Sequence, residues 1–144
     1  MRRIIIAFCI IMCSQAASAQ WKAYLSYYEP TEIEKADDGT LYVLASGGLY
    51  SYNPSDQQII TYDKTTSLSD CGIAHIAWCQ TAKRLVIVYN DYNIDLLSPN
   101  GNVVNLPAYM NTSMTDDKTI NSIDVSGSYA YLATNFGIVQ INVA

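Results

Sequence analysis

The chain has 144 residues and a formal net charge of −5 at neutral pH. This acidic balance argues against nucleic acid and anionic membrane surfaces as partners, because both attract cations. The acidic residues are scattered rather than clustered, so we interpret them as solubilising.

The first nineteen residues have the pattern of a signal peptide. Arg2 and Arg3 form a positive start, and the apolar run Ile4–Met12 is too short to span a bilayer. A small-residue site, Ala17–Ala19, follows, so we predict cleavage after Ala19. The mature chain would have 125 residues and a net charge of 6 − 13 = −7, since the two arginines are lost. We therefore expect an exported protein without a membrane span.

Lipid attachment at Cys13 is the alternative for this leader. Met12 is bulky where such sites want a small residue, and the small-residue cleavage site comes later in the chain. These two features favour cleavage after Ala19.

From residue 31 onward one pattern occurs three times: strand, hairpin turn, strand, short loop, strand. First strands are expected at 31–36, 73–78 and 120–125, and second strands at 41–45, 84–89 and 129–134. Third strands are expected to start at Gly48, Asn93 and Gly137, which are 45 and 44 residues apart. Fourth strands follow twice, at 59–62 and 103–106. Glycine and asparagine tolerate positive φ, so we expect at least one of Gly48 and Gly137 to adopt it.

Four short antiparallel strands repeated about every 40–45 residues are typical of the blades of a β-propeller. The sequence therefore predicts an all-β fold, an incomplete β-propeller of about three four-stranded antiparallel blades in an open arc. The blades are expected at about 31–66, 72–108 and 119–144. The segment 20–28 alternates like a strand and is expected to belong to the blade that closes the ring.

The mature chain is too short for a closed ring. Its 125 residues correspond to roughly 2.8 blades, whereas propellers have about four to eight. The third blade ends at 141–144 with its third strand. We therefore expect a piece of a larger domain, with apolar surface exposed at both ends of the arc.

Asp95 is an unusual residue in an otherwise apolar strand, YNDYNIDLL at 89–97. Third strands of a blade lie away from the ring axis, so we expect this carboxylate to point at solvent near a blade edge.

Cys71 and Cys79 remain after processing of the leader. If 72–78 is a strand, their α-carbons lie about 26 Å apart, whereas a disulfide needs them within about 7 Å. We therefore predict two free thiols. His75 is the chain's single histidine, so the sequence indicates no metal site, and we interpret it as a polar strand residue.

At several points in order, the mature chain resembles a known family of propellers. The matching pieces are QWKAYLSY (20–27), NIDLL (93–97), DKTINSI (117–123) and AYLATNFGIVQIN (130–142). They resemble the N-terminal propeller of PorZ-like proteins, accessory proteins of the type IX secretion system in Bacteroidetes. The linker at 65–78 also resembles linkers of two-component-regulator propellers, with Ser67 where those usually have glycine.

This resemblance implies a periplasmic or outer-membrane-surface scaffold. PorZ-like proteins work with a sortase-like protease that attaches cargo to lipopolysaccharide. Lipopolysaccharide binding in that family is ascribed to a C-terminal domain that this chain lacks. The resemblance transfers no catalytic residues.

No catalytic, cofactor-binding or metal-binding residues are predicted. The acidic segment 37–40 is interpreted as a hairpin turn rather than half a calcium loop. Candidates for a partner surface are the tyrosines near loops, because each ring offers apolar area and a polar tip. These are Tyr27, Tyr28, Tyr92 and Tyr109. Two alternatives stay open: the sensor propeller of a hybrid two-component regulator, and a propeller enzyme with groups converging at the channel mouth.

Overall fold

The computed structural model describes residues 27–144. The predicted signal peptide and nearly all of the segment 20–28 lie outside the described residues. Tyr27 and Tyr28, the two described residues of that segment, belong to no strand.

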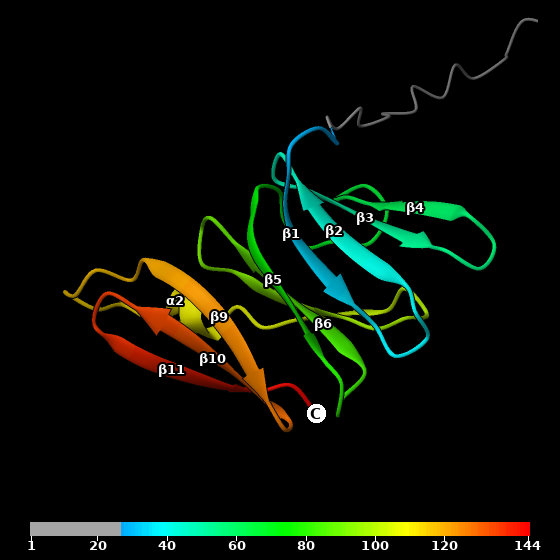
Figure 1. The fold of residues 1–144 in the computed structure, drawn as a ribbon. Coiled ribbons are helices and arrows are strands. Elements are labelled where there is room, and N and C mark those ends of the chain that lie inside the picture. The colour runs from blue at the N-terminus through cyan, green and yellow to red at the C-terminus, as the bar shows by residue number, and fades with distance from the viewer. Residues whose placement is uncertain (1–26) are drawn as a thin grey trace, which may run out of the picture.

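The described residues form three antiparallel sheets and one short helix (Figure 1). The first sheet contains β1 (Pro30–Lys35), β2 (Leu41–Ala45), β3 (Gly48–Asn53) and β4 (Gln58–Tyr62), in that order. The second contains β5 (Ile73–Cys79), β6 (Arg84–Tyr89), β7 (Ile94–Leu97) and β8 (Val103–Asn105). The third contains β9 (Ile120–Ser126), β10 (Tyr129–Thr134) and β11 (Gly137–Asn142). The helix α2 (Ala108–Asn111) lies between β8 and β9.

The three sheets lie beside one another as consecutive blades of an open arc (Figure 1). The first strands of neighbouring sheets are in contact, β1 with β5 and β5 with β9. Each sheet is ordered as the chain runs, by hairpins, which is the strand order of a propeller blade. The predicted fold class, an all-β incomplete propeller, is confirmed.

The second sheet is buried on both faces, and β6 shows how. Leu85, Ile87 and Tyr89 belong to the core shared with the first sheet. Val86 and Val88 belong to the core shared with the third sheet. Each of these five side chains is at most 1% exposed. Successive strand residues point to opposite faces, so an unbroken apolar run fits a strand between two neighbours.

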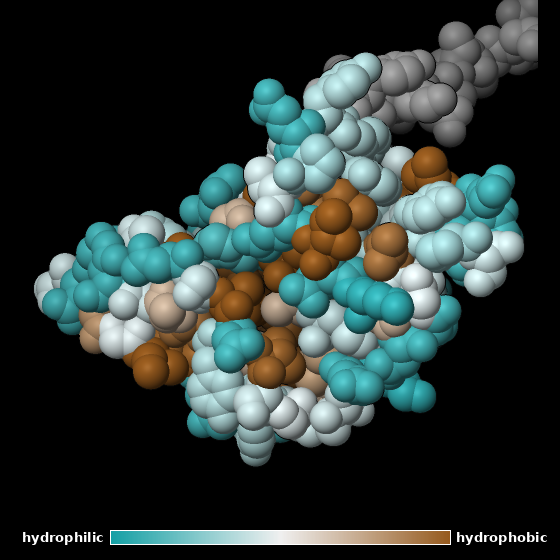
Figure 2. Space-filling model, in the orientation of Figure 1, coloured by the Kyte–Doolittle hydropathy of each residue, from teal (hydrophilic) through white to brown (hydrophobic). Residues whose placement is uncertain are grey.

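The outer faces of the first and third sheets expose large apolar side chains. Ile33 is 61% exposed, Ile59 62% and Ile138 77%. In the view of Figure 2, apolar side chains also gather between the first and third sheets. Exposed apolar surface at both ends is what the sequence predicts for an open arc.

The expectation that at least one of Gly48 and Gly137 has a positive φ is confirmed. Gly137 begins β11 with a φ of +148°. Gly48 begins β3 but is not among the residues with positive φ, because the preceding Ser46 (φ +50°) and Gly47 (φ +73°) make the turn. Positive φ at both central residues is the geometry that matches strand twist in a two-residue hairpin.

Cys71 lies shortly before β5 and Cys79 is the last residue of β5. Both are free thiols in the structure. Cys71 is exposed and Cys79 is buried. The strand that the prediction of two free thiols presupposes is therefore present, and thiol counting remains its direct test.

Candidate partner surface

The turns and linkers on one side of the arc form a single surface, which we call the loop face. It consists of residues 46–47, 63–72, 90–93, 106–119 and 135–136, which join the strands at this side of the three sheets. Backbone hydrogen bonds connect neighbouring segments. The N–H of Ile73 donates to Gly47 O at 3.1 Å, and that of Asn90 donates to Gly72 O at 2.9 Å. The N–H of Asn135 donates to Thr119 O at 3.1 Å, so the loop face is continuous across all three blades.

The linker 63–72 begins with a compact turn organised by Asp63. Its carboxylate accepts the backbone N–H groups of Thr65 (2.7 Å) and Thr66 (3.0 Å). Bonds to Thr65 hold the pKa of the Asp63 carboxyl below its usual value. The next apolar residue, Leu68, is 5% exposed and packs into the core between the first two sheets. The linker is thus fixed at both of these points.

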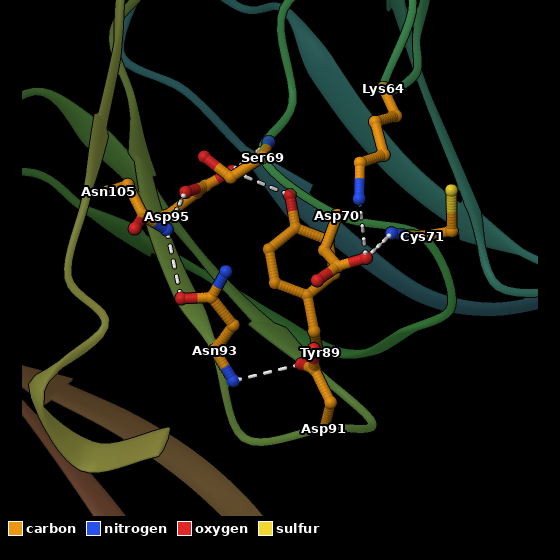
Figure 3. Close-up of polar contacts among 9 residues, drawn as sticks. All are labelled: Lys64, Ser69, Asp70, Cys71, Tyr89, Asp91, Asn93, Asp95 and Asn105. Atoms are coloured by element: carbon orange, nitrogen blue, oxygen red, sulfur yellow. Dashed lines mark hydrogen bonds and ion pairs between the residues drawn. The ribbon is translucent and has the colours of Figure 1, made fainter. Parts of the chain in front are cut away.

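Asp95 fixes the end of the same linker from beneath (Figure 3). Its Oδ2 accepts the backbone N–H of Ser69 at 2.8 Å and the hydroxyl of Tyr89 at 2.6 Å. Its Oδ1 accepts the side-chain amide of Asn105 at 2.8 Å, and that amide also donates to Asn93 Oδ1 at 2.9 Å. One carboxylate therefore joins β6, β7, β8 and the linker.

The expectation that Asp95 points at solvent is wrong. The residue is 0% exposed. A buried carboxylate is tolerated when hydrogen bonds satisfy its oxygens, and three donors do so here. Burial, with the bond to Asp95, raises the pKa of Tyr89 far above its ordinary value, so the hydroxyl stays protonated and donates.

Above this network the loop face carries a cluster of aromatic rings, which we call the aromatic cluster: Tyr92, Tyr109 and Phe136. Tyr92 lies in the turn before β7, Tyr109 in α2 and Phe136 in the turn before β11. The rings of Tyr92 and Tyr109 meet edge to face at 6.2 Å, and those of Tyr109 and Phe136 stack at 6.5 Å. Phe136 is 39% exposed. Three segments far apart in the sequence thus present one apolar surface.

Lys118 holds this cluster in place. Its Nζ donates to the carbonyl oxygens of Tyr109 (2.6 Å), Met110 (2.9 Å) and Thr112 (2.9 Å), at the end of α2. It also lies over the Tyr109 ring, 5.0 Å from the centroid. The Tyr109 hydroxyl in turn donates to Lys118 O at 2.8 Å. Lys118 therefore satisfies helix-end carbonyls, a known role of lysine.

The structure brings together two of the four tyrosines predicted from the sequence, Tyr92 and Tyr109. Tyr28 is 79% exposed and lies next to the turn at 46–47, since Ser46 Oγ donates to its carbonyl at 2.6 Å. Tyr27 packs edge to face on Tyr50 of β3, 5.4 Å between centroids. Tyr27 and Tyr28 are therefore at the first-blade end of the arc, apart from the aromatic cluster.

The sequence interpretation missed Phe136 and Lys118. Phe136 follows Asn135 in a tight turn between two strands, where a large apolar residue is unusual. Its position in the sequence could have indicated an exposed binding residue. In the turn before β7 the residue with positive φ is Tyr92, at +71°, which the sequence analysis did not anticipate. A bulky residue in this region is strained.

A second polar arrangement lies on the inner strands, away from the loop face. Glu32 of β1 bonds His75 of β5 (Oε1–Nδ1 2.7 Å) and accepts the N–H of Ile76 at 2.8 Å. Glu34 accepts the N–H of Trp78 at 3.2 Å. The side of a groove of about 350 Å³ is formed by Glu32, Glu34, His75 and Ile76, together with residues 121–123 of β9. His75 is thus a link between blades rather than only a polar strand residue.

Within residues 27–144, no group of three or more His, Cys, Asp or Glu side chains is arranged to hold a metal ion. Among the same residues, no helix is long and apolar enough to cross a membrane.

The sheet order, the inner contacts of β1, β5 and β9, and the loop face define a partial β-propeller. Comparisons with known proteins agree. The family model of the N-terminal β-propeller domain of PorZ, of the type IX secretion system, matches residues 41–144. The chain belongs to this family.

Solved structures give the same result. One of them is PorZ from Porphyromonas gingivalis, described as an essential surface component of its type IX secretion system. Its sequence is 31% identical to this chain, and the two structures superpose with a TM-score of 0.79. The match covers 85% of this chain and 16% of that one, so the chain spans about a sixth of PorZ. The search of curated proteins found no match.

Two sensor propellers from B. thetaiotaomicron share the fold. The extracellular domain of a putative hybrid two-component system is 20% identical with a TM-score of 0.62, covering 84% of this chain and 17% of that one. The extracellular domain of a putative one-component system is 18% identical with a TM-score of 0.62, and the match covers 85% of this chain and 17% of that one. At this identity the likeness shows the fold alone.

Proposed function

We propose that this chain is the opening part of a non-catalytic propeller that serves as a binding scaffold in type IX secretion. The family match over residues 41–144 and the 31% identity to PorZ support this context. By the same likeness the protein would be exported and would act in the periplasm or at the outer-membrane surface. Its partners would be proteins of the secretion and attachment machinery, such as the sortase-like protease, and lipopolysaccharide would be bound by a separate C-terminal domain.

The observation that carries the scaffold role is the aromatic cluster on the loop face. Aromatic side chains are enriched at the centres of protein-binding surfaces. The cluster rests on a rigid base, since Asp95 and Lys118 join the loops beneath it by buried or multiple hydrogen bonds. A rigid base lowers the entropy that binding would otherwise cost. Tyr28, on the same face, extends the proposed surface toward the first blade.

The alternative function is the sensor propeller of a hybrid two-component regulator. The shared fold supports it, at 20% identity. The DNA that follows codon 144 separates the two functions. Further blades without a kinase support the secretion scaffold, and a membrane helix followed by a kinase supports the sensor.

Genetic complementation tests the scaffold proposal. A type IX-secreting strain that lacks the gene would receive the complete reading frame, as wild type or as Phe136→Ala combined with Tyr28→Ala. Both rings are exposed, so the variant should fold. We expect cargo to accumulate uncleaved in the variant at equal protein abundance. The matched control, Phe136→Tyr with Tyr28→Phe, keeps both rings and should restore processing. Normal cargo processing by the alanine variant would contradict the proposal.

A further inference from the structure

We propose that the aromatic cluster of the loop face binds a basic segment of a partner protein, rich in lysine or arginine. This inference rests on the scaffold function proposed above and adds the chemical class of the partner.

The first step is the charge of the loop face and the residue just before β1. These segments contain six acidic residues and two basic ones. The acidic residues are Glu29, Asp63, Asp70, Asp91, Asp116 and Asp117, and the basic ones are Lys64 and Lys118. These segments therefore carry a formal charge of 2 − 6 = −4, which is most of the −5 of the whole chain.

The second step is that both lysines are already engaged. Lys64 Nζ lies 3.2 Å from Asp70 Oδ1. Lys118 Nζ is surrounded by three carbonyl oxygens under the aromatic cluster. Lys118 is therefore not available to an anionic ligand, and Lys64, whose side chain is 55% exposed, is paired with a carboxylate of the same face.

The third step is the position of the carboxylates relative to the rings. Asp91 is next to Tyr92 in the chain, and Asp116 and Asp117 directly precede Lys118, which touches the Tyr109 ring. All three carboxylates are on exposed residues. Hydrogen bonds from Thr119 and Asn135 hold the pKa of Asp117 below its usual value, so it is ionised at neutral pH. Burial, with the charge of Asp117, raises the pKa of Tyr109, which stays neutral.

Lys118 Nζ already lies over the rings of Tyr92 (5.7 Å) and Tyr109 (5.0 Å), so the ring open to a further cationic side chain is Phe136, which is 39% exposed. An ammonium or guanidinium is attracted to the face of an aromatic ring, and more so when carboxylates stand beside it. An anionic partner would meet unscreened carboxylates. Charge complementarity therefore selects a basic protein segment over nucleic acid, an anionic lipid surface or a second copy of this acidic chain.

The test uses the protein encoded by the complete reading frame and a fluorescein-labelled decalysine peptide, with binding followed by anisotropy at low salt. We expect Phe136→Ala and Asp116→Asn each to weaken binding about two- to fivefold. The matched controls are Phe136→Tyr, which keeps the ring, and Asp37→Asn, which removes an exposed turn carboxylate from the opposite side of the arc. Both controls should bind decalysine like wild type.

Two results would overturn the inference. One is that labelled decaglutamate binds as tightly as decalysine. The other is that the Asp37→Asn control loses as much affinity as Asp116→Asn, which would mean diffuse attraction to an acidic protein. If decalysine binding fails these criteria while Phe136→Ala with Tyr28→Ala still blocks cargo processing, the scaffold function stands and only the partner class is wrong.

Discussion

The middle blade and the two outer blades have the same strand pattern but very different burial. In β6 of the middle blade, the five residues from Leu85 to Tyr89 are at most 1% exposed. In the outer blades, Ile59 of β4 is 62% exposed and Ile138 of β11 is 77% exposed. In β10, the equivalent strand of the third blade, the two buried residues are Ala130 and Leu132, which face the middle blade. The difference between β6 and β10 therefore comes from neighbours, as in other repeat proteins.

The polar groups differ in the same way. The middle blade buries a carboxylate, Asp95, within a satisfied network. The described carboxylates of the outer blades are exposed or partly exposed, including Glu34 on β1 and Asp117 before β9. The largest mutational effects should therefore fall in the middle blade.

Removal of the Asp95 carboxylate should have the largest effect. Asp95→Ala would leave the donors of Ser69, Tyr89 and Asn105 without their shared acceptor, which we expect to lower the free energy of unfolding by about 3–5 kcal/mol. Urea unfolding of the protein from the complete reading frame, followed by fluorescence, measures it. Asp37→Ala, at an exposed turn, is the control and should change stability by less than about 0.5 kcal/mol. Equal effects of the two variants would contradict the buried network.

Truncation of matched isoleucines compares the blades directly. Ile87→Ala opens a cavity in the core between the first two sheets, so we expect a loss of about 2–5 kcal/mol in any context. Ile138 is 77% exposed within residues 27–144, but a further blade of the complete protein would cover it. In the product of the complete reading frame, urea unfolding should therefore show a cost well above about 0.5 kcal/mol for Ile138→Ala. A cost below that value would show that nothing covers the third sheet.

Gly137→Val tests the start of the outer strand β11. Its φ of +148° disfavours residues with a side chain, although a Cβ atom there would meet no neighbour within 4 Å. Backbone strain alone should therefore lower stability by about 1–2 kcal/mol. Gly101→Val, at a φ of +86° with equally open surroundings in the middle blade, is a matched comparison. An unchanged melting temperature for Gly137→Val would contradict the strand alignment.

The smallest effect concerns the contact of the first blade with the middle one. Burial raises the pKa of Glu34 above its ordinary value of 4.5. The folded state therefore binds this proton more tightly than the unfolded state, so stability from Glu34 rises as pH falls through the folded pKa toward 4.5. The carboxyls of Asp63 and Asp117 have lowered pKa values, so the stability that they contribute is lost only as the pH falls below their ordinary value of 3.8. Glu34→Gln should remove the gain in melting temperature that this group gives as the pH falls from 7 toward 4.5; an identical pH profile in both proteins would be the contrary result.

Much of the fold could be predicted from the sequence because strand periodicity and turn residues are local signals. The predicted second strands 41–45, 84–89 and 129–134 coincide with β2, β6 and β10. The helix α2 was not predicted. It has four residues and no side-chain cap at its N-terminus, so it leaves no periodic pattern.

The candidate site was less predictable, because it depends on contacts between distant segments. Asp95 was placed in solvent, since nothing near it in the sequence shows that Ser69 and Asn105 reach it. Tyr92 and Tyr109 were named from their position near loops, but Phe136 joins them only through the packing of the second and third blades. Local patterns identify strands, whereas a surface assembled from three linkers requires the fold.

The state of the isolated mature chain tests the central claim most directly, namely that these three blades are part of a larger ring. Residues 20–144 and the product of the complete reading frame would be compared by size-exclusion chromatography with light scattering and by thermal melting. We expect the 125-residue chain to oligomerise or aggregate and to melt without a single cooperative transition, because both outer sheets expose apolar faces. The longer protein should show no such aggregation and should melt cooperatively. A monomeric 125-residue chain with one cooperative transition would contradict the claim and would favour a self-sufficient small β domain.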